Sequence, residues 1–208
     1  MLHRLAAFAL ILATPAFAQD DEEFDPAAVS VTDAINCHLD APTYNGFALG
    51  VSGDDGVATQ LGWVKIETDN PFLLEYRLPE PVAVTGEWQT DHIAFSSSGI
   101  LAVLDEPDPA VIAGPEGIVN KMDPEALIVE IVASGAATRA EVEAEIHFRK
   151  FLGQRVLVDV TEPAEKPGGF GTHTVIARSV SNATSHPGKT LYGCSYRIEL
   201  LDGQGNPL

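Results

Sequence analysis

The chain has 208 residues, 45% of them hydrophobic, and carries 12 Lys and Arg against 30 Asp and Glu, a formal net charge of −18. This acidity argues against nucleic acid and anionic membrane surfaces as partners, because like charges would have to be brought together. The sequence has no Gly-x-Ser-x-Gly elbow, no glycine-rich phosphate loop and no His-Glu-x-x-His helix, so we predict no cofactor.

The N-terminus has the pattern of a secretory signal peptide. Met1–Arg4 is a basic start, Leu5–Leu12 is an apolar run, and Ala16–Ala18 has the small-x-small pattern of a cleavage site. The apolar run is too short to span a bilayer, and no later segment reaches 18 consecutive apolar residues. We therefore expect removal of residues 1–18, no membrane insertion, and a location in a bacterial periplasm or the medium.

An acidic segment would open the mature chain. Asp20–Asp25 holds five carboxylates in six residues, and their mutual repulsion favours a disordered tail, which we place at 19–34. Removal of the leader takes away only one charged residue, Arg4, so the net charge becomes −19 over 190 residues. Residues 35–208 are then expected to form one β domain, large enough to bury about 70% of its unfolded surface.

Cys37 and Cys194 are the only cysteines. An isolated pair in an oxidising compartment usually forms a disulfide. Neither residue belongs to a Cys-x-x-Cys motif, which would tune the thiol pKa for redox chemistry. We predict a Cys37–Cys194 bridge that joins the first and last parts of the domain, with two free thiols as the alternative.

Turn signals rich in Gly, Pro, Asn and Asp recur along the rest of the chain and separate short segments with β-branched and aromatic residues. This pattern is typical of many short antiparallel strands. We predict an all-β single domain, an antiparallel β-sandwich with a barrel as the alternative. The expected strands are Phe47–Ser52, Ala58–Glu67, Phe72–Leu78, His92–Phe95, Ile100–Leu104, Arg155–Thr161, Thr174–Val180 and Thr190–Leu200.

Ala140–Phe148 alternates apolar and polar residues without exception. The alternation favours a strand with Val142, Ile146 and Phe148 buried on one face, because a helix would carry these side chains on two opposed sides. Thr138 and Glu141 have the spacing of a helix capping box, which is the competing signal.

Asp123–Gly135 could also be strand or helix. Its Asp-Pro-Glu start is typical of a helix, but Ile128–Val132 contains four β-branched residues, so we favour a buried strand. The Pro-rich span Asp105–Pro115 is expected to be an irregular or partly helical crossover.

Histidines near carboxylates are the candidate metal or acid–base groups. Glu145 and His147 would share one strand face, where they could bind a divalent metal, although an ordinary solvent face is the favoured interpretation because no third ligand is implied. Asp91 and His92 look like a dyad, but adjacent side chains on a strand point to opposite faces. We therefore expect His92 to be a half-buried residue at a strand end.

Three further residues could contact a ligand. His38 adjoins the expected bridge and could approach His173, and Phe170 lies at the tip of the loop 167–173. Structural histidines and a plain connecting loop are the ordinary interpretation. Asp202–Asn206 resembles the start of a calcium loop, but the chain ends before the Glu that would close it.

Together these patterns favour an exported, non-catalytic binding or accessory domain whose partner is a small ligand, a cation or a basic protein. A metal-dependent or acid–base hydrolase that uses His147 or His173 is one alternative. Calcium binding by the acidic surface is another. The sequence identifies neither the ligand nor the oligomeric state.

Overall fold

The computed structural model describes residues 24–166 and 168–208, so the expected signal peptide and Asp20–Glu23 lie outside the described residues. The strands are β1 (Val64–Ile66), β2 (Leu74–Ala83), β3 (Gln89–Phe95), β4 (Gly99–Leu104), β5 (Leu152–Glu162), β6 (Gly171–Ser181) and β7 (Thr190–Leu201). The helices are the 3-10 helix η1 (Pro26–Ala28) and α1 (Val31–Ile35), α2 (Ala41–Gly50), α3 (Val57–Gln60), α4 (Pro109–Ala113), α5 (Glu125–Ala133) and α6 (Arg139–Ala144). None of these described helices combines the length and hydrophobicity needed to cross a membrane.

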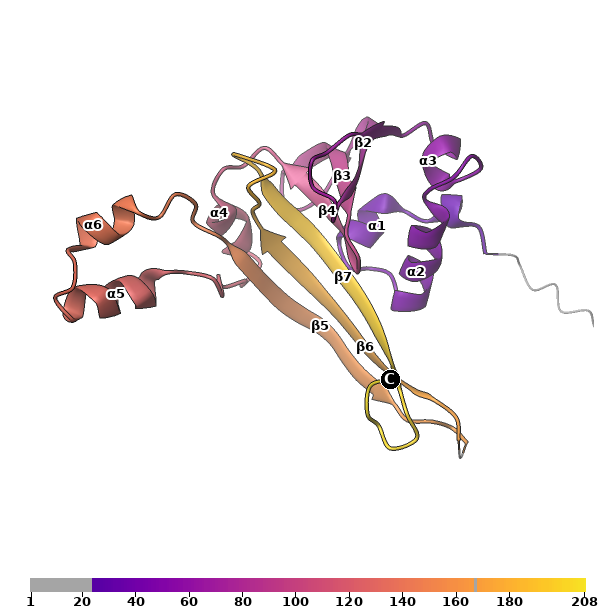
Figure 1. The fold of residues 1–208 in the computed structure, drawn as a ribbon. Helices are drawn as coiled ribbons and strands as arrows, with labels where there is room; N and C mark the ends of the chain where they lie inside the picture. Colours follow the sequence, from indigo (N-terminus) through magenta and orange to yellow (C-terminus); the bar gives the residue numbers. More distant parts are fainter. Residues whose placement is uncertain (1–23, 167) are drawn as a thin grey trace, which may run out of the picture.

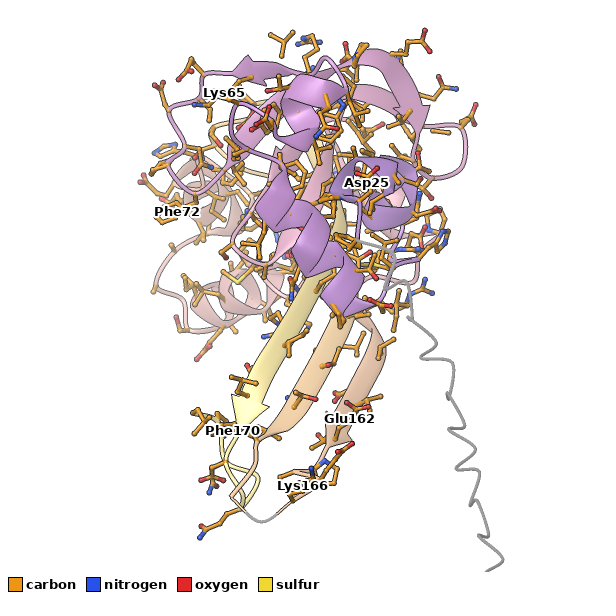
Figure 2. The ribbon with its side chains drawn as sticks, turned by 90° about the vertical axis from the view of Figure 1, so that its right-hand side faces the viewer. Asp25, Lys65, Phe72, Glu162, Lys166 and Phe170 are labelled. Carbon is orange, nitrogen blue, oxygen red and sulfur yellow. A yellow bond between two sulfur atoms is a disulfide. The ribbon has the colours of Figure 1, made fainter. Side chains whose placement is uncertain are left out.

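The strands form one sheet in the order β1-β2-β3-β4-β7-β6-β5, and each neighbouring pair is antiparallel. The predicted antiparallel β fold is confirmed at this level. In the described residues, helices supply the second layer that a sandwich would build from strands (Figure 1). Strands β5, β6 and β7 are long and extend past these helices (Figures 1 and 2).

The main hydrophobic core lies between the sheet and the N-terminal helices. Tyr44 of α2 stacks on Tyr196 of β7 with ring centroids 4.2 Å apart, and the Tyr196 hydroxyl donates to the carbonyl oxygen of Ala34 at 2.7 Å. Other fully buried core residues are Ile35, Phe47, Ile93, Ile100 and Tyr192. We call the sheet face that contacts this core the core face, and the opposite one the outer face.

The predicted Cys37–Cys194 disulfide is confirmed, with the two Cα atoms 5.3 Å apart. It ties the end of α1 to the middle of β7. Cys37 has a φ of 60°, a left-handed conformation that side chains other than glycine rarely adopt. The guanidinium of Arg178 donates to the Asn36 carbonyl at 2.8 Å and so holds the same turn to β6.

Two N-terminal strand predictions are wrong in whole or in part. Phe47–Ser52 lies mainly in α2, and Ala58–Glu67 is divided between α3 and β1. Helix α2 begins where the Asp40 carboxylate accepts a hydrogen bond from the Thr43 N–H at 2.7 Å. This cap, together with buried residues at helical spacing, outweighs the local β propensity.

The strand prediction for Ala140–Phe148 is wrong, because the capping box at Thr138 and Glu141 forms and starts α6. Phe148 is 40% exposed, so it is not the core residue that the alternation indicated. The segment projects away from the sheet (Figure 1), so none of the described strands lies beside it to pair with a strand there. Local capping therefore decides its structure.

Asp123–Gly135 is likewise helical in its centre, as α5, and the strand prediction is wrong. The Asp123 carboxylate accepts from the Glu125 N–H at 3.0 Å, which fixes the first turn. Ile128 alone of the β-branched run is buried. The crossover Asp105–Pro115 contains α4, in agreement with the expected partly helical segment.

The described part of the expected disordered tail is ordered. Residues 26–28 form η1, and α1 begins after Ser30, whose hydroxyl oxygen accepts from the Asp33 N–H at 3.2 Å. Ala34 and Ile35 are fully buried under the sheet. The prediction of disorder to residue 34 is therefore wrong from Phe24 onward, because apolar burial begins before the acidic composition ends.

Candidate metal centre

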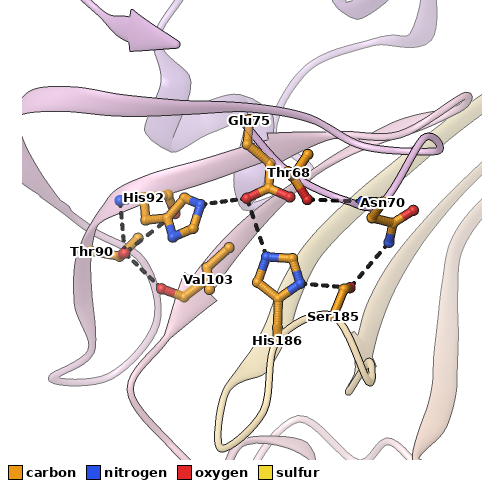
Figure 3. A network of polar contacts seen from close by, with 8 residues as sticks. All are labelled: Thr68, Asn70, Glu75, Thr90, His92, Val103, Ser185 and His186. Carbon is orange, nitrogen blue, oxygen red and sulfur yellow. Dashed lines mark hydrogen bonds and ion pairs between the residues drawn. The ribbon is translucent and has the colours of Figure 1, made fainter. Parts of the chain in front are cut away.

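A carboxylate and two imidazoles meet on the outer face of the sheet. Glu75 lies on β2 and His92 on β3, and the register places Glu75 opposite Ala94 and His92 opposite Arg77. Glu75 and His92 are therefore diagonal neighbours on one face. His186 comes from the turn between β6 and β7, which folds over this face (Figure 3).

Both imidazoles use Nε2 to contact the same carboxylate oxygen. Nε2 of His92 lies 2.8 Å from Oε2 of Glu75, and Nε2 of His186 lies 3.2 Å from it. One ligand atom from each of the three residues can be chosen so that all lie within 4.8 Å of one another. The arrangement brings together groups from three separate parts of the chain.

The Glu75 carboxylate is almost completely removed from solvent. Glu75 is 2% exposed and His186 8%, while the His92 side chain retains 20% exposure. Burial by itself would raise the pKa of Glu75, but hydrogen bonds from His92 and His186, together with the Thr68 hydroxyl, outweigh it and hold the pKa below its ordinary value. The carboxylate is therefore ionised at neutral pH.

The second oxygen of Glu75, Oε1, is buried and has no hydrogen-bond partner among the described residues. An unsatisfied buried acceptor usually costs about 1–3 kcal/mol, more when charged. Bound cations and ordered waters are the usual partners of such an atom. Oε1 is thus an acceptor that a bound cation or an ordered water would satisfy.

An outer polar partner orients the His186 imidazole. The Ser185 hydroxyl lies 3.0 Å from Nδ1 of His186 and accepts from the Asn70 amide at 3.2 Å. Such a partner fixes ring orientation and tautomer at metal-binding histidines. At His92 the Thr90 hydroxyl accepts from the backbone N–H at 3.0 Å and donates to the Val103 carbonyl at 2.7 Å, so it fixes the strand and not the ring.

Two imidazoles and one carboxylate form a donor set suited to zinc. Zinc binds His nitrogen at about 2.0–2.1 Å and carboxylate oxygen at about 2.0–2.2 Å, so tetrahedral ligand atoms lie roughly 3.3–3.6 Å apart. The contacts from Glu75 to His92 and His186 need to open by only about half an ångström to reach that spacing. The Ser185 hydroxyl can accept from Nδ1 of His186, which leaves Nε2 available to a metal.

The sequence analysis named His92 but not its partners. As expected, Asp91 does not pair with His92; its carboxylate binds Arg77 at 2.8 Å. Glu75 and His186 were missed. The one available signal was the charged Glu75 within the expected strand Phe72–Leu78, and the sequence analysis drew nothing from it.

The predicted pair Glu145 and His147 is not brought together by a strand. Glu145 is the C-cap of α6 and His147 follows it, exposed to solvent, and the described residues show no hydrogen bond or ion pair between them. The shared face on which that metal prediction rested does not exist, because the segment is helical.

His38 and His173 have different polar partners and do not contact each other. Nδ1 of His38 lies 3.3 Å from Asp33, whereas His173 contacts Asp159 through Nε2 at 2.9 Å and Glu199 through Nδ1 at 3.5 Å. His38 borders a cavity together with Thr174, and the adjacent His173 points to the opposite face of β6. The expected approach of the two imidazoles is therefore not formed.

Phe170 is exposed near the far end of the β5–β6 hairpin (Figure 2). Its position agrees with the expected loop tip. The structure shows no contact that assigns it a ligand.

Comparison of the chain with protein-family models, with curated proteins and with solved structures gives no match. The functional conclusion therefore depends on the geometry of the Glu75, His92 and His186 site.

Proposed function

We propose that this chain is an exported, non-catalytic binding domain that holds one divalent transition-metal ion, with zinc the best suited, between Glu75, His92 and His186. The observation that carries the proposal is the buried Glu75 carboxylate, which has two imidazole Nε2 atoms on one oxygen and no partner on the other. A metal ion would take the place of the imidazole–carboxylate hydrogen bonds at Oε2, and a carboxylate that bound it through both oxygens would satisfy Oε1 as well.

Structural zinc usually has four protein ligands, whereas catalytic zinc has three and keeps a fourth position for water or substrate. This site offers three protein ligands, so a water molecule would complete the coordination. The burial of Glu75 and His186, with the His92 side chain 20% exposed, supports an ion that stabilises the fold over one that meets a substrate. The ion would tie the β6–β7 turn to β2 and β3.

A metal-dependent enzyme built on His147 or His173 has less support. His147 is exposed and has no polar partner among the described residues. Both ring nitrogens of His173 already face carboxylates, which favours an ion-paired imidazole over a metal ligand.

Export is part of the same proposal. The basic start, apolar run and cleavage pattern of residues 1–18 support secretion, and the Cys37–Cys194 bridge supports an oxidising compartment such as a bacterial periplasm. For the fold, we propose a two-layer, sandwich-like packing rather than a closed barrel, since β1 and β5 are both sheet edges.

Isothermal titration of chelator-treated protein with Zn²⁺ tests the metal proposal. We expect about one equivalent of Zn²⁺ to bind the wild type. His186→Asn or Glu75→Gln should weaken binding by more than about 100-fold, because loss of a direct ligand costs more affinity than loss of a residue that only hydrogen-bonds to a ligand, which costs about 10–100-fold. His147→Asn and His173→Asn are matched controls that should bind as the wild type does. Near-ultraviolet circular dichroism checks that each variant is folded.

Two results would contradict the proposal. One is the absence of zinc binding by folded wild-type protein. The other is equal binding by the wild type and by a folded His186→Asn variant, because the ion would then lie elsewhere.

A further inference from the structure

The distal halves of β5, β6 and β7 form an arm that we define as residues 157–162, 171–176 and 196–201. Figure 1 shows the three strands running past the helices that cover the rest of the sheet, and Figure 2 shows Glu162, Lys166 and Phe170 at the far end. The core face of the sheet therefore continues onto the arm beyond the helical layer.

Apolar side chains occupy this uncovered face. Val158 pairs with Ile176 and Thr172 with Leu200, which places Val158 and Leu200 on the same face as the buried Tyr196. Val160, two residues beyond Val158, is 49% exposed. Apolar side chains that lie next to one another on an exposed face, as these do, mark an interaction surface when they form a contiguous patch.

A groove begins where the helices end. It has a volume of about 540 Å³ and lies between the arm and the connection from α1 to α2. Its apolar lining comes from Leu39, Ala41, Pro42, Val158, Val160 and Ile176. This volume is in the range of sites that hold a small ligand or a short peptide segment.

The polar lining of the groove is acidic. Asp40 and Glu162 carry its carboxylates, and His38 is the one basic side chain in the lining. The Asp40 carboxylate caps α2, and Glu162 contacts only the Thr172 hydroxyl, at 3.3 Å, so neither carboxylate is neutralised by Lys or Arg among the described residues. The formal net charge of the whole chain, −18, has the same sign as the groove.

We propose that this groove binds an extended segment of a partner protein in which apolar residues alternate with Lys or Arg. The apolar residues would cover Val158 and Val160, and the cations would meet Asp40 and Glu162. A second copy of this acidic chain, an acidic peptide or an anionic membrane would bring like charges together. The groove lies on the core face and the Glu75 site on the outer face, so the two proposals are independent.

The probe is a fluorescent peptide of about six residues, roughly 20 Å when extended, that alternates Val and Lys. A peptide that alternates Val and Glu is its acidic counterpart. Fluorescence anisotropy is measured with the full mature chain as wild type, Val160→Lys and Val156→Lys. Val156 and Val160 are similarly exposed, at 53% and 49%. Val156 pairs with Ala177 and lies on the outer face, so Val156→Lys adds the same charge outside the groove and serves as the control.

We expect the Val-Lys peptide to bind the wild type and Val156→Lys similarly, and Val160→Lys to weaken binding by about tenfold, or about 1.4 kcal/mol. The Val-Glu peptide should not bind. Equal effects of the two substitutions, equal binding of both peptides, or no binding of the Val-Lys peptide would overturn the proposal. It would also be overturned if Val160→Lys abolished self-association in sedimentation, or binding to phosphatidylglycerol vesicles, because the occupant would then be a second copy or a membrane.

Discussion

Glu75 and His92 are diagonal neighbours on adjacent antiparallel strands, and Oε2 of the first lies 2.8 Å from Nε2 of the second. Sheet register alone creates this pair. His186 is 111 residues from Glu75 in the sequence and completes the group only when the β6–β7 turn closes over the sheet. Metal binding at this site would therefore report on long-range folding.

Zinc should stabilise the native protein against unfolding. At a free concentration of 100 times the dissociation constant, an ion that binds only the native state adds about 2.7 kcal/mol. We expect the melting temperature to rise with Zn²⁺ for the wild type and to stay constant for His186→Asn. Mg²⁺ is the control, since it prefers oxygen ligands and should have no effect. An equal rise for His186→Asn would place the stabilising ion elsewhere.

Loss of the Cys37–Cys194 bridge should be costly, and its cost should depend on the residue that replaces Cys37. The bridged residues are 157 apart, so removal of the bridge as Cys37→Ala/Cys194→Ala is expected to cost about 2–5 kcal/mol. Because Cys37 has a φ of 60°, Cys37→Gly/Cys194→Ala should lose about 1 kcal/mol less. Urea denaturation measures both variants. A glycine variant less stable than the alanine variant would show that the turn relaxes once the bridge is gone.

His173 should make stability depend on pH. Hydrogen bonds with Asp159 and then Glu199 raise the pKa of His173 above its ordinary value. Its contribution is fully present below the unfolded pKa of about 6.5 and is lost as pH rises through the higher folded pKa. His173→Asn should therefore destabilise the protein at about pH 5.5 and have little effect near pH 9. Denaturation of His173→Asn and of the control His147→Asn at both pH values tests this sign; a larger loss at the high pH would contradict it.

Two phenylalanines should differ strongly in their contribution to stability. Phe47 is fully buried in the core and contacts Phe95 with ring centroids 5.8 Å apart, whereas Phe148, beyond α6, is 40% exposed. Phe47→Ala should cost about 3–5 kcal/mol and Phe148→Ala about 0.5 kcal/mol or less. Equal losses in urea denaturation would support the strand that alternation predicted for residues 140–148.

Much of the sheet could be predicted from the sequence. Six expected strands overlap β2 to β7, and the Cys37–Cys194 bridge was derived from cysteine count and compartment. Strand and helix were confused where local capping competes with β-rich composition, as at Asp40 before α2 and at Thr138 before α6. A residue pattern shows which faces are apolar, but not whether a neighbouring strand is present to pair with them.

The candidate metal centre could not be assembled from the sequence. Glu75 shares a strand face with the charged Arg77, and nothing local indicated that the β6–β7 turn would cover that face. His186 lies in a Ser-His-Pro-Gly turn that carries no metal-ligand spacing to Glu75 or His92. Long-range closure of the sheet, rather than a motif, creates this site.

Visible absorption of the chelator-treated protein titrated with Co²⁺ tests the metal centre most directly. Co²⁺ can replace zinc, and its visible bands are much stronger in a four-coordinate site with His and carboxylate ligands than in the six-coordinate aqueous ion. We expect strong bands that saturate near one equivalent in the wild type and in His147→Asn, and that are absent in folded His186→Asn. Weak bands typical of six-coordinate Co²⁺, or the same strong bands in His186→Asn, would contradict a metal ion held by Glu75, His92 and His186.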